Sequence, residues 1–165
     1  MTSTSKIRVY INGIVDEGVG AYAYIVLENK DCGVVQITNG KGRLFAPSLL
    51  RAKFAQAGKA NDDCRMKMRA AYEGVRHCPD GAQVEIYTDN FLLDDMLQST
   101  RPNDADGDIA QKYRDYIAAH GIRVSFVMTK TYHGKDYPAN DHDEWTWYAH
   151  WLCENEIKKF KKTNK

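Results

Sequence analysis

Three short segments within the first forty residues have the hydrophobic patterns of β-strands. In residues 6–12 (KIRVYIN) every second residue is aliphatic, which is the period of a strand with one buried face. Residues 21–28 and 34–38 are short runs rich in β-branched and aromatic residues, and glycine and asparagine mark the turns between them. Three such runs joined by short turns predict an antiparallel meander.

A helical period replaces this alternation further along the chain. Within residues 62–78 apolar residues recur every three or four positions, Asp62 and Asp63 suit the positive end of a helix, and Pro79 ends it. Residues 83–89 alternate again and predict a strand. The remaining predicted elements are helices at about 91–98, 108–120 and 142–160 and a strand at 122–129. This order predicts an α/β fold in which helices flank a mixed sheet.

Residues 39–61 fit neither period. Pro47 and three glycines interrupt them, and the stretch SLLRAKFAQA predicts a short helix with Ser48 as its N-cap. We predict a basic insertion at 39–61 and a basic tail at 158–165, within a single domain of residues 1–165. The insertion is either a solvated face or a contact for nucleic acid or a protein partner. Its basic residues, which have no acidic residue among them, are Lys41, Arg43, Arg51, Lys53 and Lys59.

The overall composition excludes several classes of protein without selecting a partner. The 165 residues include 23 Lys and Arg against 22 Asp and Glu, so the net charge of +1 gives no global attraction to nucleic acid. No apolar run reaches the ~20 residues of a membrane helix, and the first residues lack the apolar segment of a secretory signal. Four cysteines without zinc-ligand spacing predict reduced thiols and a cytoplasmic location.

Polar residues gather where the predicted strands end, and such ends commonly hold the functional sites of α/β sheets. Asn12 ends the first strand and Asp89 the fourth, while Asp143 and Glu144 open the last helix. Lys67 falls on the apolar stripe of the first predicted helix. The sequence has no phosphate-binding glycine loop, nucleophile elbow or H-E-x-x-H zinc motif, so its candidate chemistry lies with these polar residues.

Four short motifs at these positions resemble those of the type 1 ribonuclease H family. They are VYING at the first strand, CRMKM on the first helix, IYTDN at the fourth strand and PANDHDE before the last helix. Family members carry Asp-Gly, Arg-Met-Glu-Leu, a Thr-Asp-Ser-like motif and an Asn-rich loop followed by an acid at these elements. The resemblance covers about residues 6–155. It implies an RNase H-like mixed five-stranded sheet, with three antiparallel strands followed by parallel ones.

The resemblance also implies a nuclease site, in which four carboxylates hold two divalent ions at a phosphodiester. The first-strand acid of the family falls on Asn12 and the helix acid on Lys67, whereas the fourth-strand acid is retained as Asp89. The last acid is Glu144, or Asp143 if the alignment slips by one residue. Asp89 and Glu144 are thus the expected ligands if Mg²⁺ or Mn²⁺ binds, and otherwise no cofactor is expected. The four positions sum to a charge of −1 instead of −4.

Further positions correspond to substrate contacts in the family. Asp63 and Cys64 replace two asparagines that contact the minor groove of an RNA/DNA hybrid, just before the matching Arg65. This departure weakens the inherited recognition of a hybrid. The other implied residues are Asn90 after the retained acid, the loop residue Asn140, and His133 as the candidate for the family's flexible-loop histidine.

Lys67 is the residue on which the functional hypotheses differ. Its ammonium could pair with Asp89 in place of a metal, pair with Asp63 four residues earlier, or extend to solvent. We therefore expect an RNase H-like nucleic-acid-binding domain that is catalytically inactive or strongly impaired, with RNA, DNA or a hybrid as ligand. One alternative is an active metal-dependent ribonuclease that cleaves RNA in RNA/DNA hybrids through a rebuilt site. The other is a protein-interaction module that uses the aromatic residues of the C-terminal region.

Overall fold

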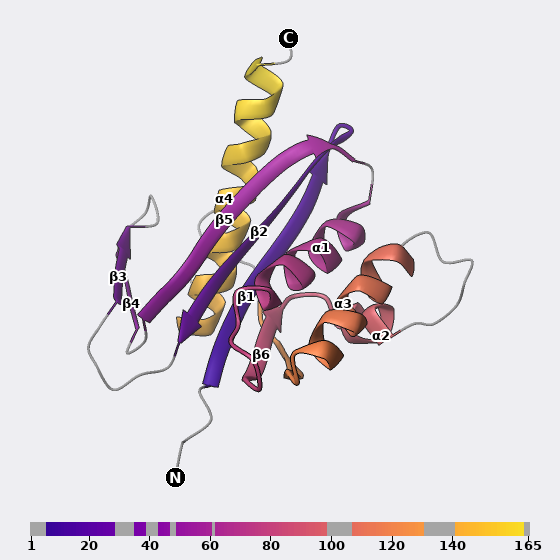
Figure 1. The fold of residues 1–165 in the computed structure, drawn as a ribbon. Coiled ribbons are helices and arrows are strands. Elements are labelled where there is room, and N and C mark those ends of the chain that lie inside the picture. Colours follow the sequence, from indigo (N-terminus) through magenta and orange to yellow (C-terminus); the bar gives the residue numbers. More distant parts are fainter. Residues whose placement is uncertain are drawn as a thin grey trace.

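The computed structural model describes residues 6–28, 35–38, 43–46, 49–60, 62–98, 107–130 and 141–163. These ranges form seven strands and four helices (Figure 1), and none of these helices has the length and hydropathy of a membrane span. The strands are β1 (Lys6–Asp16), β2 (Val19–Glu28), β3 (Val35–Thr38), β4 (Arg43–Ala46), β5 (Leu49–Lys59), β6 (Gln83–Thr88) and β7 (Arg123–Met128). The helices are α1 (Asp63–Val75), α2 (Leu93–Gln98), α3 (Gly107–Ala119) and α4 (Asp141–Thr163).

Five of the strands form one sheet in the order β5-β2-β1-β6-β7. β2 is antiparallel to both of its neighbours, β1 and β5. β6 is parallel to both of its neighbours, β1 and β7. This is the predicted mixed sheet of three antiparallel strands followed by parallel ones, and β1 lies at its centre (Figure 1).

The edge strand on the antiparallel side corrects the sequence prediction. Residues 35–38 form β3, but it pairs with β4 in a separate two-stranded sheet. The third strand of the main sheet is instead β5, so the short helix predicted there is wrong. The alanines that favour a helix are small enough to pack on both faces of the sheet, and pairing with β2 outweighs their helix preference. Residues 49–59 of the predicted basic insertion therefore belong to the main sheet.

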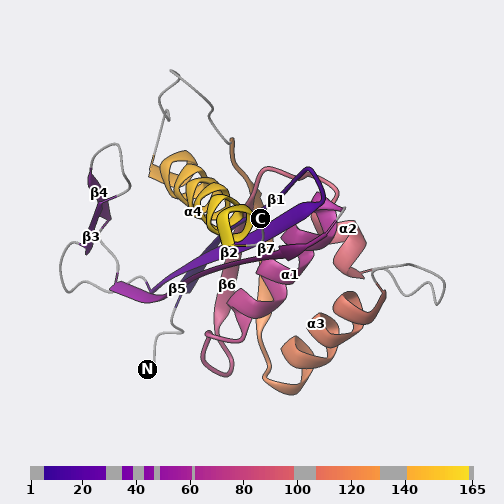
Figure 2. The same ribbon diagram turned by 90° about the horizontal axis from the view of Figure 1, so that it is seen from above.

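Two hydrophobic cores lie on the two faces of this sheet. Figure 2 shows α1, α2 and α3 on one face and α4 on the other. β1 contributes to both cores because its side chains alternate: Val9 and Ile11 pack on the α1 side, and Tyr10 packs on the α4 side. Helices on both faces therefore enclose the central strands, and β1 continues beyond the point where its neighbour β6 ends.

Candidate functional site

The carboxyl end of β6 lies beside the middle of β1, at the centre of the sheet. The two strands are parallel with Tyr10 opposite Tyr87, and the two rings stack with their centroids 4.5 Å apart. Asn12 and Asp89 each follow two residues later, so they occupy corresponding positions where β6 ends, although β1 does not end at Asn12 as predicted and continues beside β2 to Asp16. This is the position in the fold at which the sequence places the candidate chemistry.

Asn12 is 1% exposed, and its side-chain amide is used to hold the structure together. Its Oδ1 accepts a hydrogen bond from the Gly13 N–H at 2.9 Å, and its Nδ2 donates to the Thr146 carbonyl of α4 at 3.4 Å. A carboxylate has no hydrogen to donate to a carbonyl. The contact with Thr146 therefore suits an amide at this position, and it ties β1 to the first turns of α4.

Helix α1 begins with a capping residue that positions its first turn. Asp62 has an extended backbone, and its Oδ1 accepts hydrogen bonds from the N–H groups of Cys64 at 3.0 Å and Arg65 at 3.4 Å. These bonds satisfy two of the N–H groups that a helix leaves unpaired at its start. The first turn of α1 is therefore firmly placed, and Lys67 follows in the next turn.

Gly13 allows α1 to cross β1 at very short range. A Cβ at Gly13 would lie 2.5 Å from the backbone nitrogen of Lys67 and 2.6 Å from the carbonyl carbon of Met66. The sequence predicts that Gly13 marks a turn, but β1 continues through it to Asp16. The missing side chain is required because a helix backbone rests directly on the strand at this residue.

This crossing directs Lys67 to Asp89. Lys67 Nζ lies 3.1 Å from Oδ1 of Asp89, and the two side chains are 12% and 22% exposed. Of the three arrangements that the sequence allows for Lys67, the structure has the ion pair with Asp89. The two charges cancel and Asn12 is neutral, so these three groups offer no net negative charge. Mg²⁺ and Mn²⁺ require several anionic oxygen ligands, and the three residues do not fit a two-metal centre.

The turn after Asp89 is joined to α1 by hydrogen bonds. The Asn90 N–H donates to Oγ1 of Thr88 at 3.1 Å, and Asn90 Nδ2 donates to Sγ of Cys64 at 3.4 Å. Burial, reinforced by the carboxylate of Asp63, raises the pKa of the Cys64 thiol. The structure thus brings together Asn90 and Cys64, two of the implied substrate contacts, and keeps the thiol protonated.

Two threonines that sequence reasoning missed form the wall beside this site. The Thr129 N–H donates to the Thr88 carbonyl at 2.8 Å, and its hydroxyl hydrogen-bonds to the Thr146 hydroxyl at 2.7 Å. Both threonines are buried, and together with Asn12 they fix the start of α4 against β1 and β7. No sequence motif marks them, because their role appears only when α4 packs on the sheet.

The start of α4 also carries the predicted acids. Asp143 and Glu144 lie in the first turn of α4, just before Thr146. The structure does not describe the side chains of Asp143 and Glu144. The predicted loop residues His133 and Asn140 also lie outside the described residues.

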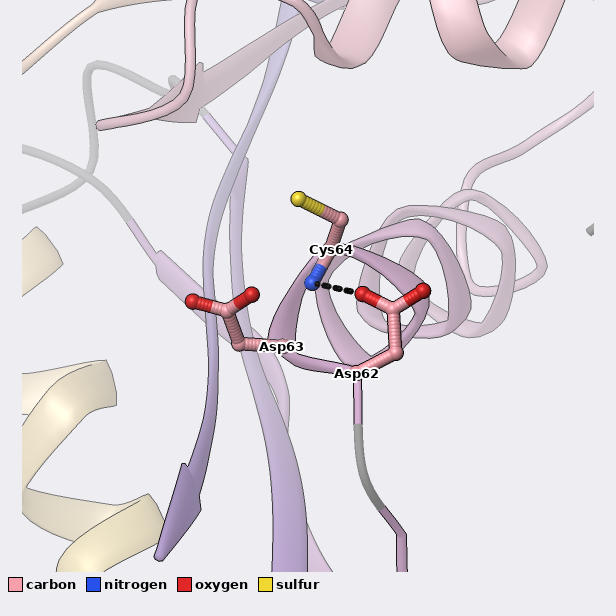
Figure 3. Close-up of side chains that lie close together, drawn as sticks. All are labelled: Asp62, Asp63 and Cys64. Atoms are coloured by element: carbon pink, nitrogen blue, oxygen red, sulfur yellow. Dashed lines mark hydrogen bonds between the residues drawn. The ribbon is translucent and has the colours of Figure 1, made fainter.

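Three residues that could ligate a metal gather at the start of α1 (Figure 3). Carboxylate oxygens of Asp62 and Asp63 and Sγ of Cys64 lie within 4.8 Å of one another. Figure 3 shows the Asp62 carboxylate turned to the N–H of Cys64, where it caps the helix. Cysteine binds metals as the thiolate, whereas the raised pKa of Cys64 keeps it as a thiol. Helix capping therefore accounts for this cluster.

The basic residues of segment 39–61 have different surroundings. Arg51 forms an ion pair with Glu28, and Lys53 Nζ donates to the Tyr148 hydroxyl at 3.2 Å. Lys59, at the end of β5, is exposed. Of the cations predicted to contact nucleic acid whose side chains the structure describes, Lys53 and Lys59 are exposed and form no ion pair with a described carboxylate, and Lys53 hydrogen-bonds to Tyr148. Lys41 and the side chain of Arg43 lie outside the described residues.

Arg65 contacts an acid on a neighbouring helix. Its two terminal nitrogens lie 3.3 Å and 3.2 Å from the two carboxylate oxygens of Asp108 in α3. Hydrogen bonding to Arg65 lowers the pKa of Asp108. This bidentate pair joins the first turns of α1 and α3, and no sequence motif predicts it.

The aromatic residues of the C-terminal region belong to the core in the described structure. Trp145, Trp147 and Tyr148 are buried against the sheet, and Trp151 is half-buried with its ring stacked on Tyr148. They fill the core between α4 and the sheet. This packing removes the observation that would favour a protein-interaction module.

Known structures share this fold at low sequence identity. No protein-family model matches the sequence, and no curated protein matches it. The N-terminal RNase H domain of Rv2228c from Mycobacterium tuberculosis matches with a TM-score of 0.63 at 13% identity, over 98% of this chain and 100% of that one. RNase H1 from Halobacterium salinarum NRC-1 matches with a TM-score of 0.61 at 10% identity, over 93% and 98%. LC11-RNase H1 in complex with RNA/DNA hybrid matches with a TM-score of 0.60 at 13% identity, over 94% and 99%.

These similarities extend over nearly the whole length of both chains in each comparison. Together with the sheet order and the four helices, they show that the chain has the RNase H-like fold. Identities this low establish the fold alone. The chemistry of the chain has to be argued from its own residues.

Proposed function

We propose that this chain is an RNase H-like domain that binds nucleic acid and in which metal-dependent cleavage is lost or severely reduced. The ion pair between Lys67 and Asp89 carries the proposal. An ammonium about 4 Å from a divalent ion is repelled by roughly 8 kcal/mol at an effective dielectric of 20. A metal at Asp89 would have to overcome that repulsion or displace Lys67 from a sheltered ion pair.

Asn12 supports the proposal independently of Lys67. The amide donates to the Thr146 carbonyl, which is a contact that an ionised acid would turn into a repulsion between two oxygens. The two altered positions thus act in the same direction: one removes a negative charge and the other adds a positive one. Both replacements are integrated into the packing around the site, as expected of a site that no longer holds divalent ions.

The choice of nucleic acid as ligand rests on structural neighbours. They are RNase H proteins, and one of them was solved in complex with RNA/DNA hybrid. Fold similarity alone is an argument by analogy, so binding and cleavage require separate tests. We further propose a cytoplasmic location, in keeping with cysteines that are free in the described structure.

A cleavage assay with a repaired site tests the loss of catalysis. Wild-type protein and the double variant Asn12→Asp/Lys67→Glu are incubated with RNA/DNA hybrid, single-stranded RNA and duplex DNA in Mg²⁺ or Mn²⁺. We expect the double variant to cleave the hybrid. We expect the wild type to show no more cleavage than the Asp89→Asn variant, which defines the background. Lys112→Glu, which makes the same charge change as Lys67→Glu but on the exposed face of α3, is the control.

The competing function is an active ribonuclease with a rebuilt site. It predicts Mn²⁺- or Mg²⁺-dependent hybrid cleavage by the wild type that Asp89→Asn abolishes, and this result would overturn the proposal. Nucleic-acid binding is measured separately, by gel shift of the wild type at low salt with the same three substrates.

A further inference from the structure

A second candidate site lies on the other side of α1, between this helix and the end of edge strand β5. It is a cavity of about 120 Å³, lined among others by Gly20, Tyr22, Gln56, Gly58, Lys59 and Arg69. β2 contributes its floor, β5 one wall and α1 the other. β5 is the edge strand of the sheet (Figure 1), so the cavity lies at this edge.

The charged residues that line the cavity are both cations, Arg69 and Lys59. Most other lysines and arginines of the described structure have a carboxylate or another polar partner, but no described carboxylate forms an ion pair with either of these two. The nearby acid is Glu73, one turn further along α1. Its negative charge helps to raise the pKa of Tyr22, and it forms an ion pair with Arg76. The cavity therefore combines positive charge with no described acid in its lining.

The polar groups of the cavity are arranged as hydrogen-bond donors. The Arg69 guanidinium lies over the Tyr22 ring, 5.1 Å from its centroid, which limits its freedom to move. The Tyr22 hydroxyl donates to Oε1 of Gln56 at 3.2 Å, so the Gln56 amide N–H groups are available to a ligand. Burial raises the pKa of Tyr22, and the neutral phenol keeps its proton for that hydrogen bond. A ligand thus meets side-chain donors from Arg69 and Gln56, whereas Lys59 shares the face of its partner Val19 and lines the cavity at the end of β5 without pointing its side chain into it.

Two glycines give the cavity its space. A Cβ at Gly20 would lie 2.5 Å from the Ala60 Cβ, so only glycine fits at the floor. A Cβ at Gly58 would meet nothing within 4 Å, which places open space directly above the β5 backbone. A small group can therefore approach the strand closely between Arg69 and Gly58.

An exposed aromatic ring adjoins this cavity. Phe54 is 43% exposed, and one face of its ring stacks on Tyr24 with centroids 5.8 Å apart. Phe54 precedes Gln56 by two residues on the same face of β5, and two strand residues span about 7 Å. The donor cavity and the exposed ring are thus neighbours along one strand.

We propose that this surface binds an unpaired nucleic-acid strand, with a phosphate in the cavity and the adjacent base stacked on Phe54. The inference rests on the proposed nucleic-acid binding and adds where the strand binds and that it is single-stranded. Cationic and amide donors without an acid select an anionic phosphate. An aromatic ring presented at the surface takes up a base only when that base is not stacked within a duplex.

Fluorescence anisotropy with a labelled oligothymidylate tests the site directly. We expect Arg69→Gln to weaken binding by about tenfold and to lower the salt dependence of binding by about 0.7 for the phosphate that is no longer neutralised. We expect Phe54→Leu to weaken binding by about tenfold as well. Lys112→Gln/Arg123→Gln removes two exposed cations from α3 and β7 and should leave the affinity unchanged. Circular dichroism and thermal unfolding verify that each variant is folded.

The outcomes separate this inference from the proposed function. If the wild type binds the oligothymidylate and the site variants bind it equally well, the inference is overturned while the proposed function stands. If the wild type prefers duplex or hybrid and Phe54→Leu has no effect, a paired ligand is established and the inference again fails. If the wild type binds no nucleic acid of any kind, both fail together. Selective weakening by the site variants and not by the control supports both.

Discussion

A lysine on the apolar stripe of a helix can reach solvent or neutralise an acid, and its surroundings determine which. Lys67 Nζ lies 3.1 Å from Asp89 Oδ1, with about nine tenths of the lysine side chain and more than three quarters of the aspartate side chain shielded from water. Removing one partner leaves the other charge in a partly desolvated position. Such a change costs more than the loss of a surface ion pair.

A double-mutant cycle at this pair measures the coupling. We expect Lys67→Met and Asp89→Asn each to lower the free energy of unfolding by about 1–3 kcal/mol. The loss in the double variant should be smaller than the sum of the two single losses by about 1–2 kcal/mol. Urea unfolding at neutral pH gives the three values. The exposed pair Lys159–Glu156 on α4 is the control, with an expected coupling of about 0.5 kcal/mol or less. Additive effects at Lys67 and Asp89 would contradict a functional ion pair.

At the scale of elements, the position of α1 on β1 decides where Lys67 points. The helix meets the strand at two glycines, because a Cβ at Gly13 would overlap the α1 backbone and one at Gly74 would lie 2.7 Å from Val9 Cγ1. Close contact at both points leaves no room for the helix to slide or tilt. The direction of Lys67 is therefore a property of the helix–strand contact.

Replacing Gly13 tests this contact. Gly13→Ala should lower the free energy of unfolding by about 2–3 kcal/mol, because the added methyl forces α1 away from β1. Gly58→Ala is the matched control, since its added methyl meets nothing within 4 Å. Urea unfolding of both variants gives the comparison. Equal stability of the two variants would show that the packing of α1 on β1 is looser than the structure indicates.

Prediction of the elements succeeded where a local pattern and the tertiary contacts agree. The helix at α1 has a capping aspartate and a clear apolar stripe, and the strand at β6 has a clear alternation, so both were predicted. β5 was predicted wrongly because its alanines favour a helix in isolation. An edge strand takes its conformation from its pairing with β2, which lies far away in the sequence.

For the whole molecule, buried tyrosines set an alkaline limit of stability. Burial raises the pKa of Tyr87 to about 12 and raises the pKa of Tyr10, its stacking partner, well above the usual range. Above pH ~10 the unfolded chain releases these phenolic protons while the folded chain retains them. The free energy of unfolding therefore falls as the pH rises from about 10 through the raised pKa values.

Urea unfolding as a function of pH tests this limit. We expect stability to be unaffected by these tyrosines below pH ~9 and to decline from pH ~10 upward, and we expect Tyr87→Phe to decline less steeply. Burial also raises the pKa of the Cys78 thiol to about 12, so part of the decline persists in the variant. A Tyr87→Phe slope identical to that of the wild type would contradict the burial of an un-ionised phenol at this position.

The sequence by itself determined the class of fold and singled out Asn12 and Lys67, where its motifs differ from those of the family that they resemble. Periodicity is local, so strands and helices could be placed, and the motifs around Asn12 and Lys67 identified the departures from the family pattern. Only the tertiary structure decided which strand completes the sheet and which of the three possible arrangements Lys67 adopts. It also revealed Arg69 beside Tyr22 and Gln56. Contacts of this kind join residues that are distant in the chain, and their geometry depends on how the helices and strands pack.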